Sequence, residues 1–335
     1  MDFCTFFYDA YVKYIFITIS SIGMILNMFC SIAFISSRDL NKEIFKYFLI
    51  KSICDAILFS RNTLNYIADN CGQDCILITS HTICYIRFGF YYFVGRSMIL
   101  ASMIFSVAAS FNRFRKSRNT FLFFNKIPFW FKLISIFLYS FGYYWYIFTG
   151  DEPCRQYFSK SNTTYYSFAN KIFRDTTYGV YLELFHSIIR DCVCLVLIIV
   201  LNILTLIFLK VSFARKRDLT TSNKSKLKSN NLLASKAQLA EKKLTLMVAA
   251  TSIINIFGHI LLFIFYFPLD VLKKNFCLKD FANLLLYISL AINFFIYYAF
   301  NKHFSNYVNK IIQKFSCGFL RFKDFEGRAS TINAS

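Results

Sequence analysis

Residues 192–209, CVCLVLIIVLNILTLIFL, contain no charged side chain. The hydrocarbon core of a bilayer is about 30 Å thick, so a helix needs roughly 20 mostly apolar residues to cross it. The residues from Tyr181 onward extend the stretch, although they include three charged side chains, Glu183, Arg190 and Asp191. We therefore predict a transmembrane helix over residues 181–209.

Six further stretches have the length and apolar character of membrane spans: 14–35, 44–68, 85–112, 127–149, 244–267 and 281–300. The second of them is the most polar, because it contains Lys46, Lys51, Asp55 and Arg61. In lipid the backbone must satisfy its own hydrogen bonds, which a helix does within one segment. The sequence therefore predicts an all-α fold, a bundle of seven transmembrane helices over residues 14–300.

The overall composition also indicates a membrane protein. Of the 335 residues, 56% are hydrophobic and 17% are charged, whereas soluble domains carry about 25% charged residues. The net charge of +20 would suit a nucleic-acid-binding protein, but the Lys and Arg side chains lie beside apolar stretches, where anionic lipid attracts them. The sequence has no nucleic-acid-binding motif and no nucleophile paired with a base, so we predict neither a nucleic-acid partner nor an enzyme.

The distribution of Lys and Arg predicts the orientation of the chain. With the N-terminus outside, the four segments that face the cytoplasm hold 23 Lys and Arg residues, and the four outer segments hold 8. Cytoplasmic loops of membrane proteins carry the excess of these residues. We therefore expect residues 1–13 outside, the tail 321–335 inside, and a multi-pass protein of the plasma membrane.

Six cysteines and a glycosylation sequon fall on the predicted outer side. Disulfides persist in an oxidising environment, and six cysteines lie on that side: Cys4, Cys71, Cys75, Cys84, Cys154 and Cys277. The sequon at Asn162 lies in the outer segment 150–180 and predicts a glycoprotein. That segment is rich in Thr and Tyr, which suit β-strands, so it forms either a hairpin or an ordinary polar loop.

The residues after the last span repeat apolar side chains at steps of three or four: Phe304, Val308, Ile311, Phe315 and Phe319. This spacing predicts a short amphipathic eighth helix over residues 301–320, lying in the membrane interface. Cys317, near its end, is a candidate for palmitoylation.

Short motifs in the predicted helices resemble those of the rhodopsin-like G-protein-coupled receptors. The resemblance covers residues 10–320 and depends on four sites in order along the chain: Asn27, Asp55, the triplet Asn112-Arg113-Phe114, and the run from Asn293 to Tyr297. Within that family the motifs are similar to those of divergent invertebrate members, including receptors like those for FMRFamide.

The resemblance implies a function. An extracellular ligand shifts the bundle between two states, and Arg113, with Asn112, Asn293 and Tyr297, couples this change to a heterotrimeric G protein. In the family an acid beside the arginine holds it in the resting state. Asn112 carries no charge, and a charge-assisted hydrogen bond is roughly twice as strong as a neutral one. We therefore expect a weaker resting lock, and expect Asn112→Asp to lower activity without ligand.

The resemblance also implies a polar hub and a disulfide. Asp55 would meet Asn27, Asn293 and a sodium ion; the alternative is an ion pair with Lys51, one turn earlier on the same helix. Cys154 would be tied to the start of the third span. Cys84 is our choice of partner, and Cys71 and Cys75 remain alternatives.

Polar side chains in the outer half of the bundle are candidates for ligand binding, because charges inside membrane spans are costly. These residues are Arg96, Glu183, Arg190, Asp191 and His259. The alternative is mutual neutralisation, for example of Arg96 by Asp191. Two arginines and no acid suited to a ligand ammonium favour a peptide or an acidic small molecule.

Two departures from the family keep a rival class open: Asn112 replaces the acid beside Arg113, and the sixth span reads Phe257-Gly258-His259 where the family usually has Cys-Trp-x-Pro. No predicted span contains an interior proline, although proline is the commonest cause of a helix kink, so any kinks must arise otherwise. The rival is a seven-helix transporter or a membrane protein that does not couple to a G protein.

Overall fold

The computed structural model describes ten parts of the chain: residues 14–37, 40–70, 80–118, 120–121, 123–145, 154–158, 164–168, 177–222, 228–266 and 276–314. Several predicted features lie outside these parts, namely the N-terminal segment 1–13, Cys71, Cys75, Asn162, Cys317 and the tail 321–335.

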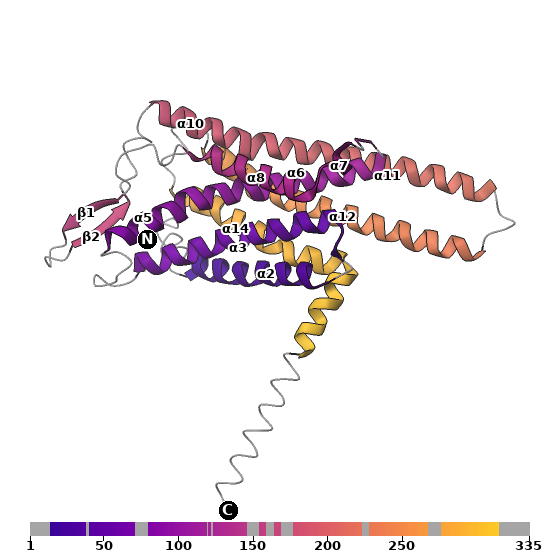
Figure 1. Ribbon diagram of the computed structural model, residues 1–335, viewed down its shortest axis with the longest axis horizontal. Helices are drawn as coiled ribbons and strands as arrows, with labels where there is room; N and C mark the ends of the chain where they lie inside the picture. Colours follow the sequence, from indigo (N-terminus) through magenta and orange to yellow (C-terminus); the bar gives the residue numbers. More distant parts are fainter. Residues whose placement is uncertain are drawn as a thin grey trace, which may run out of the picture.

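The described chain is a bundle of long helices lying side by side (Figure 1). Four long helices are continuous, namely α2 (Phe16–Ser36), α3 (Glu43–Asn70), α12 (Lys228–Tyr266) and α14 (Phe276–Phe300), and two more are composite. The composite helices are α5 (His81–Phe88), η3 (Gly89–Val94) and α6 (Gly95–Arg118), and α10 (Thr177–Ser187), η5 (Ile188–Val193) and α11 (Cys194–Ser222). The short α7 (Phe123–Lys126) precedes α8 (Phe129–Tyr143).

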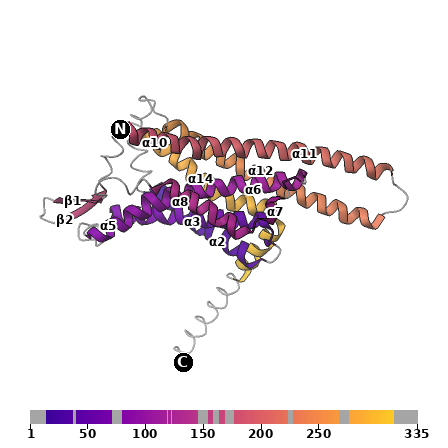
Figure 2. The same ribbon diagram turned by 45° about the horizontal axis from the view of Figure 1, so that its top comes forward.

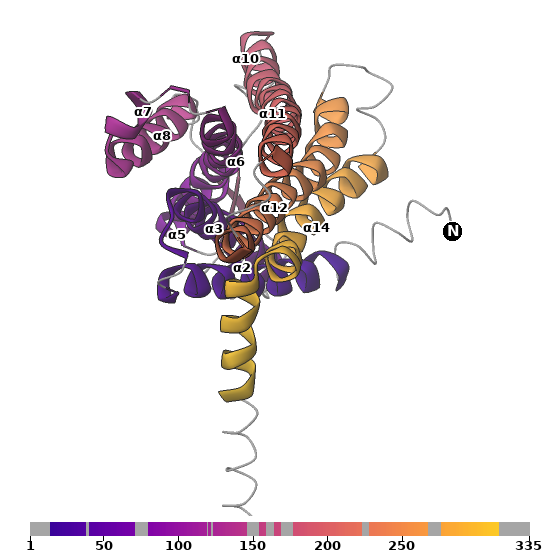
Figure 3. The same cartoon turned by 90° about the vertical axis from the view of Figure 1, so that its right-hand side faces the viewer.

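The helices differ from the predicted spans mainly at their ends. The third begins at His81 and continues to Arg118, beyond the predicted 85–112, and α8 is shorter than the predicted 127–149. Helices α11 and α12 extend well past the other helices at one end of the bundle (Figures 1 and 2). Viewed along the bundle, α14 lies beside α12, and α8 lies on the outside, beyond α6 (Figure 3).

Five helical stretches in the described chain are long and apolar enough to cross a membrane: Phe16–Ser36, His81–Arg118, Leu184–Ser212, Leu239–Ile264 and Phe281–Phe300. Helix α8 is apolar but shorter. On α2, Ile22, Ile25 and Ile32 are exposed, whereas Ser20 and Asn27 are buried. This arrangement, polar inside and apolar outside, is expected where the surroundings are lipid.

An aromatic cluster joins four helices near the end of α14. The ring of Tyr297 lies 5.3 Å from that of Phe34 and 5.1 Å from that of Phe48. Phe304, which is fully buried, packs against the same group. Residues 302–314 form a further helix that turns away from the bundle axis (Figure 1), and Asn301 Oδ1 caps it by accepting from the backbone N–H groups of His303 and Phe304.

The segment after α8 contains a β-hairpin rather than an ordinary loop. Strands β1 (Cys154–Phe158) and β2 (Thr164–Phe168) pair antiparallel, with Gln156 opposite Tyr166. The all-α expectation therefore needs this small correction. The hairpin lies at the end of the bundle where α5 begins (Figure 1); we call this the outer end, and the opposite one the inner end.

Two π-helical segments interrupt helices that contain no proline. Gly89–Val94 interrupts the third helix, and Ile188–Val193 interrupts the fifth. Such segments are a recognised cause of helix kinks and are frequent at functional sites. Arg190 and Asp191 lie within the second of them.

Candidate functional site

Arg113 joins two helices at the inner end of the bundle. It lies near the end of α6 and is only 7% exposed. Its Nη2 donates to Thr245 Oγ1 at 2.7 Å and to the backbone carbonyl of Glu241 at 3.1 Å, both on α12. The guanidinium is therefore held by α12 and not by a neighbouring acid on its own helix.

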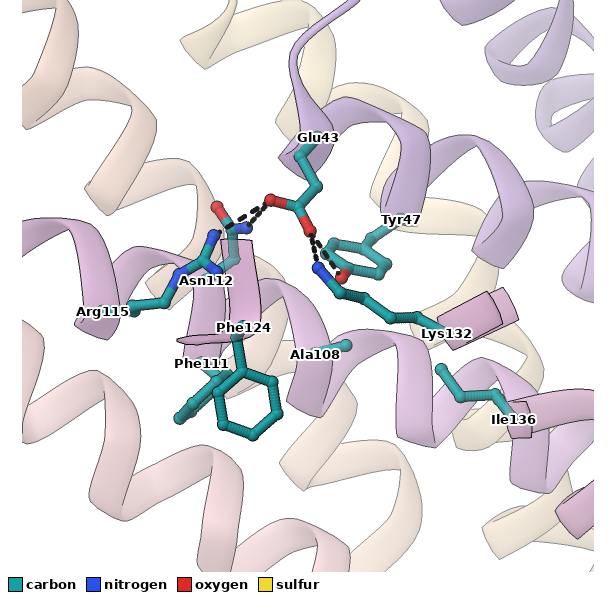
Figure 4. A pocket seen from close by; sticks show the side chains of 9 residues that line it. All are labelled: Glu43, Tyr47, Ala108, Phe111, Asn112, Arg115, Phe124, Lys132 and Ile136. Atoms are coloured by element: carbon teal, nitrogen blue, oxygen red, sulfur yellow. Dashed lines mark hydrogen bonds and ion pairs between the residues drawn. The ribbon is translucent and has the colours of Figure 1, made fainter. Parts of the chain in front are cut away.

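Asn112 faces a different partner, Glu43 at the start of α3. Asn112 Nδ2 donates to Glu43 Oε2 at 2.8 Å, and Arg115 Nη2 donates to the same oxygen at 3.0 Å. Lys132 Nζ from α8 donates to Glu43 Oε1 at 2.6 Å, and the Tyr47 hydroxyl donates to it at 3.0 Å. Four side chains from three helices thus converge on one carboxylate (Figure 4).

This Glu43 cluster lines a pocket of about 230 Å³, whose other walls are the side chains of Ala108, Phe111, Phe124 and Ile136 (Figure 4). Burial alone raises the pKa of the Glu43 carboxyl, but the hydrogen bond and charge of Lys132, with Tyr47 and Arg115, lower the pKa below its ordinary value. Glu43 is therefore ionised at neutral pH.

Sequence reasoning missed Glu43. In the triplet Asn112-Arg113-Phe114, an asparagine stands where the family has an acid. In the structure an acid does lie beside Asn112, but it is Glu43 from another helix. One available signal was Glu43 itself, an acid directly before a predicted span, close to the predicted inner membrane face.

The predicted polar hub is not formed as expected. Asp55 is 1% exposed, and its Oδ2 accepts from Lys51 Nζ at 2.7 Å, the alternative that the sequence left open. Ser102 Oγ donates to Asp55 Oδ1 at 2.6 Å. Asn27 and Asn293 are buried, but their amide nitrogens donate to backbone carbonyls of their own helices, at Gly23 and Leu290.

Tyr297 is buried in the aromatic cluster described above. Its hydroxyl, like Asn293 Oδ1 and Asn27 Oδ1, has no hydrogen-bond partner within the described parts of the chain. The structure therefore places Asn293 and Tyr297 in the interior of the bundle, and neither is among the hydrogen-bond partners of Arg113.

Three of the candidate ligand-binding residues form one buried cluster between the fifth and sixth predicted spans. Asp191 Oδ1 accepts from Arg190 Nε at 2.8 Å, and Arg190 Nη2 donates to Asp191 Oδ2. His259 Nδ1 on α12 lies 2.9 Å from Asp191 Oδ1. Asp191 thus pairs with Arg190 and His259, and the suggested pair with Arg96 is not the one found.

The remaining candidates are Arg96 and Glu183. The guanidinium of Arg96 lies 6.0 Å from the ring centre of Tyr92. The side chain of Glu183 is outside the described parts of the structure. Arg190, Asp191 and His259 are accordingly the part of the predicted ligand site that the fold brings together.

Arg61 is a second residue that sequence reasoning did not assign. It lies on α3, 7% exposed, six residues toward the outer end from Asp55. Its guanidinium donates to Asn62 Oδ1, to the Tyr287 hydroxyl and to the backbone carbonyl of Tyr91, and it lies 4.4 Å from the Tyr91 ring centre.

These partners of Arg61 are all neutral. Among the residues that the structure describes, no carboxylate forms an ion pair with it. A Cβ on Gly95 would lie 2.3 Å from Arg61 Nη1, so glycine at 95 makes room for the guanidinium. Asn62 Nδ2 is also buried without a partner within the described chain. A buried positive charge without an acid favours an anion supplied from elsewhere.

A disulfide ties the hairpin to the third helix. Cys84, buried in α5, is bonded to Cys154, the first residue of β1. Of the partners that the sequence left open for Cys154, this is the one the structure has. The hairpin is thereby held over the outer end of the helix bundle.

Comparisons with known proteins support the fold. No protein-family model matches the sequence, and neither does any curated protein. The crystal structure of squid rhodopsin is similar, with a TM-score of 0.63 over 92% of this chain and 86% of that one, at 12% sequence identity. The chain therefore shares the fold of squid rhodopsin.

Proposed function

We propose that this chain is a rhodopsin-like G-protein-coupled receptor of the plasma membrane. Seven helices cross the bilayer with the hairpin outside and Arg113 at the cytoplasmic face, and the helix at 302–314 lies in the inner interface. The excess of Lys and Arg in the inner segments supports this orientation, and the similarity to squid rhodopsin supports the fold.

The observation that carries the proposal is the contact of Arg113 with α12. A buried arginine at the end of α6 bonds to Thr245 and to the Glu241 carbonyl across the inner end. If α12 moves outward, these bonds break and the guanidinium becomes available to a protein that enters between the helices. A ligand at the outer end that favours this state would thereby be coupled to the G-protein site through one equilibrium.

The charges of the outer half support an acidic ligand. Arg61 has neutral partners only, while the single carboxylate of Asp191 is shared between Arg190 and His259. Arginine is well suited to carboxylates because its planar donors bind both oxygens. We therefore propose a ligand that bears a carboxylate, either a peptide or a small molecule, bound between the outer halves of the helices.

The proposal is tested by guanine-nucleotide exchange. Cells that express the full chain are screened with peptides and carboxylate-bearing small molecules, and each active compound is applied to Arg113→Ala and Arg113→Lys at equal surface expression. We expect both variants to bind the compound and fail to signal, because lysine lacks the fork of donors. Full signalling by Arg113→Ala, or a ligand affinity that guanine nucleotide does not change, would contradict the proposal.

A further inference from the structure

The centre of α3 contains a lysine and an aspartate that are both removed from solvent. Lys51 is 2% exposed and Asp55 is 1% exposed, and they lie one helical turn apart. A buried charge is tolerated only when it is paired and hydrogen-bonded. The arrangement of this pair therefore determines what else can occupy the centre of the bundle.

Three side chains form a closed triangle of hydrogen bonds. Lys51 Nζ donates to Asp55 Oδ2 at 2.7 Å and to Ser102 Oγ at 3.1 Å, and Ser102 Oγ donates to Asp55 Oδ1 at 2.6 Å. Both oxygens of Asp55 are thus engaged, one by a cation and one by a hydroxyl from α6. The negative charge of Asp55 is already balanced by a cation that belongs to the chain.

The sodium ion that the resemblance implied does not fit this centre. An ion bound to Asp55 would have to share the carboxylate with the Lys51 ammonium, whose nitrogen lies 2.7 Å from Asp55 Oδ2. Two positive charges on one carboxylate repel each other strongly in a medium of low dielectric constant. The amide nitrogens of Asn27 and Asn293 donate to the backbone of their own helices, and within the described chain neither residue forms a hydrogen bond with Asp55.

We propose that the Lys51 ammonium is the resident cation of this site, in the place where a sodium ion would otherwise bind. The protein is then insensitive to sodium at this site, because its cation is covalently attached and always present. The inference goes beyond the proposed receptor function, since it concerns ion binding and holds whether or not the chain couples to a G protein.

Without Lys51, we expect the same site to bind sodium. Removing the ammonium leaves a buried carboxylate bound only to Ser102, and such a group needs a cation. Asn27 Oδ1 and Asn293 Oδ1 are buried and have no hydrogen-bond partner within the described chain. These oxygens add acceptors in the same interior, so a Lys51 variant should acquire an affinity for sodium from solution.

The experiment is thermal unfolding of the purified full-length protein, in sodium chloride and in choline chloride at equal concentration, so that chloride and ionic strength are constant. Four chains are compared: the parent, Lys51→Met, Lys51→Met with Asp55→Asn, and Lys46→Met. Lys46 is a matched control, because it is a lysine of the same helix, partly exposed, that lies 5.6 Å from the Phe129 ring centre and forms no ion pair within the described residues.

We expect the parent and Lys46→Met to have the same Tm in both salts. Lys51→Met should be less stable in choline chloride, and sodium should raise its Tm saturably by about 3 °C or more. The double variant should lose this response, because it lacks the carboxylate.

A parent Tm that rises saturably with sodium would overturn the proposal, and this measurement does not depend on whether any variant folds. A folded Lys51→Met whose Tm is the same in both salts would overturn the expected sodium binding of this variant. Because neither result involves G-protein activation, failure here is distinguishable from failure of the proposed function.

Discussion

Two acids of α3, Asp55 and Glu43, have opposite surroundings although they lie on one helix. Asp55 is almost completely buried and bonds to one cation of its own helix and one hydroxyl of α6. The Glu43 side chain is 23% exposed and bonds to two cations, an amide and a phenol from three helices. The first is a closed internal pair; the second joins helices at a partly solvated end.

The difference in surroundings predicts how strongly each acid affects the stability of the protein. A buried ion pair is weak support for stability but costs a great deal when one partner is removed. A partly exposed cluster gains less from each contact, because water screens it and replaces lost partners. The Asp55 pair should therefore respond strongly to any single change, and the Glu43 cluster only moderately.

The largest expected effect is the loss of stability on breaking the Asp55 pair. In choline chloride, Lys51→Met should lower the free energy of unfolding by about 3–5 kcal/mol, because it leaves an uncompensated buried charge. Adding Asp55→Leu should restore most of the loss, because the site is then apolar. Denaturation in mixed micelles measures both. Equal stability of Lys51→Met and the parent would show that water or another group reaches Asp55.

The contact of Arg113 with α12 is the next strongest. Thr245→Val removes the hydroxyl that accepts from Arg113 Nη2 at 2.7 Å. A hydrogen bond to a charged group contributes about 1.5–3 kcal/mol, so the ratio of open to closed states should rise by about 10-fold or more.

Guanine-nucleotide exchange without ligand reports this shift for Thr245→Val. Thr251→Val is the matched control, because the Thr251 hydroxyl donates only to the Met247 carbonyl of its own helix among the interactions described. Unchanged exchange in Thr245→Val would mean that the contact does not hold the closed state.

Asn112→Asp tests whether Asn112 acts through the Glu43 cluster or through the resting lock on Arg113 that the sequence suggested. From the motif alone, a new acid beside Arg113 should lower activity. In the structure, however, Asn112 donates to Glu43 at 2.8 Å, so a carboxylate at 112 would face another carboxylate. We expect Asn112→Asp to lower stability by about 1–2 kcal/mol and adding Glu43→Gln to recover most of it. Lower basal exchange with unchanged Tm would support the earlier expectation instead.

Much of the fold follows from the sequence because lipid imposes a simple rule. Apolar length alone marked the helices, and charge bias marked the orientation proposed above. The hairpin at 154–168 and the bond from Cys154 to Cys84 were each one of two or more alternatives, because strand pairing and disulfide pairing depend on how distant segments meet.

The site was harder to predict than the helices. The motif placed Arg113 at the end of a helix, and the helix in fact continues to Arg118. The partners of Arg113, Thr245 and the Glu241 carbonyl, lie more than a hundred residues away in the sequence. For Asp55 the family motif favoured Asn27 and Asn293 over Lys51, which lies one turn away and prevailed. A local ion pair needs no tertiary arrangement, and here it outweighed the pattern.

The smallest expected effect is the dependence of stability on the ionisation of Glu43. The pKa of this carboxyl is lowered in the folded protein from a usual value of 4.5, against the raising effect of burial, by Lys132, Tyr47 and Arg115. A group whose pKa is lowered on folding stabilises the protein above its unfolded pKa, and the contribution is lost as the pH falls through the folded pKa. The contribution should therefore be complete at neutral pH and be lost progressively as the pH falls below about 4.5.

Glu43→Gln should accordingly cost about 1 kcal/mol at pH 7, because glutamine still accepts hydrogen bonds but no longer balances Arg115 and Lys132. The Tm difference between the parent and this variant should narrow as the pH falls from about 5 to about 3, since protonation removes the same charge from the parent. Tyr47→Phe is the control: it removes one donor to Glu43 Oε1 and leaves both salt bridges, so its smaller Tm difference should change less with pH. A Glu43→Gln difference that stays constant over this range would mean that the hydrogen bonds, and not the charge, hold the three helices together at the inner end.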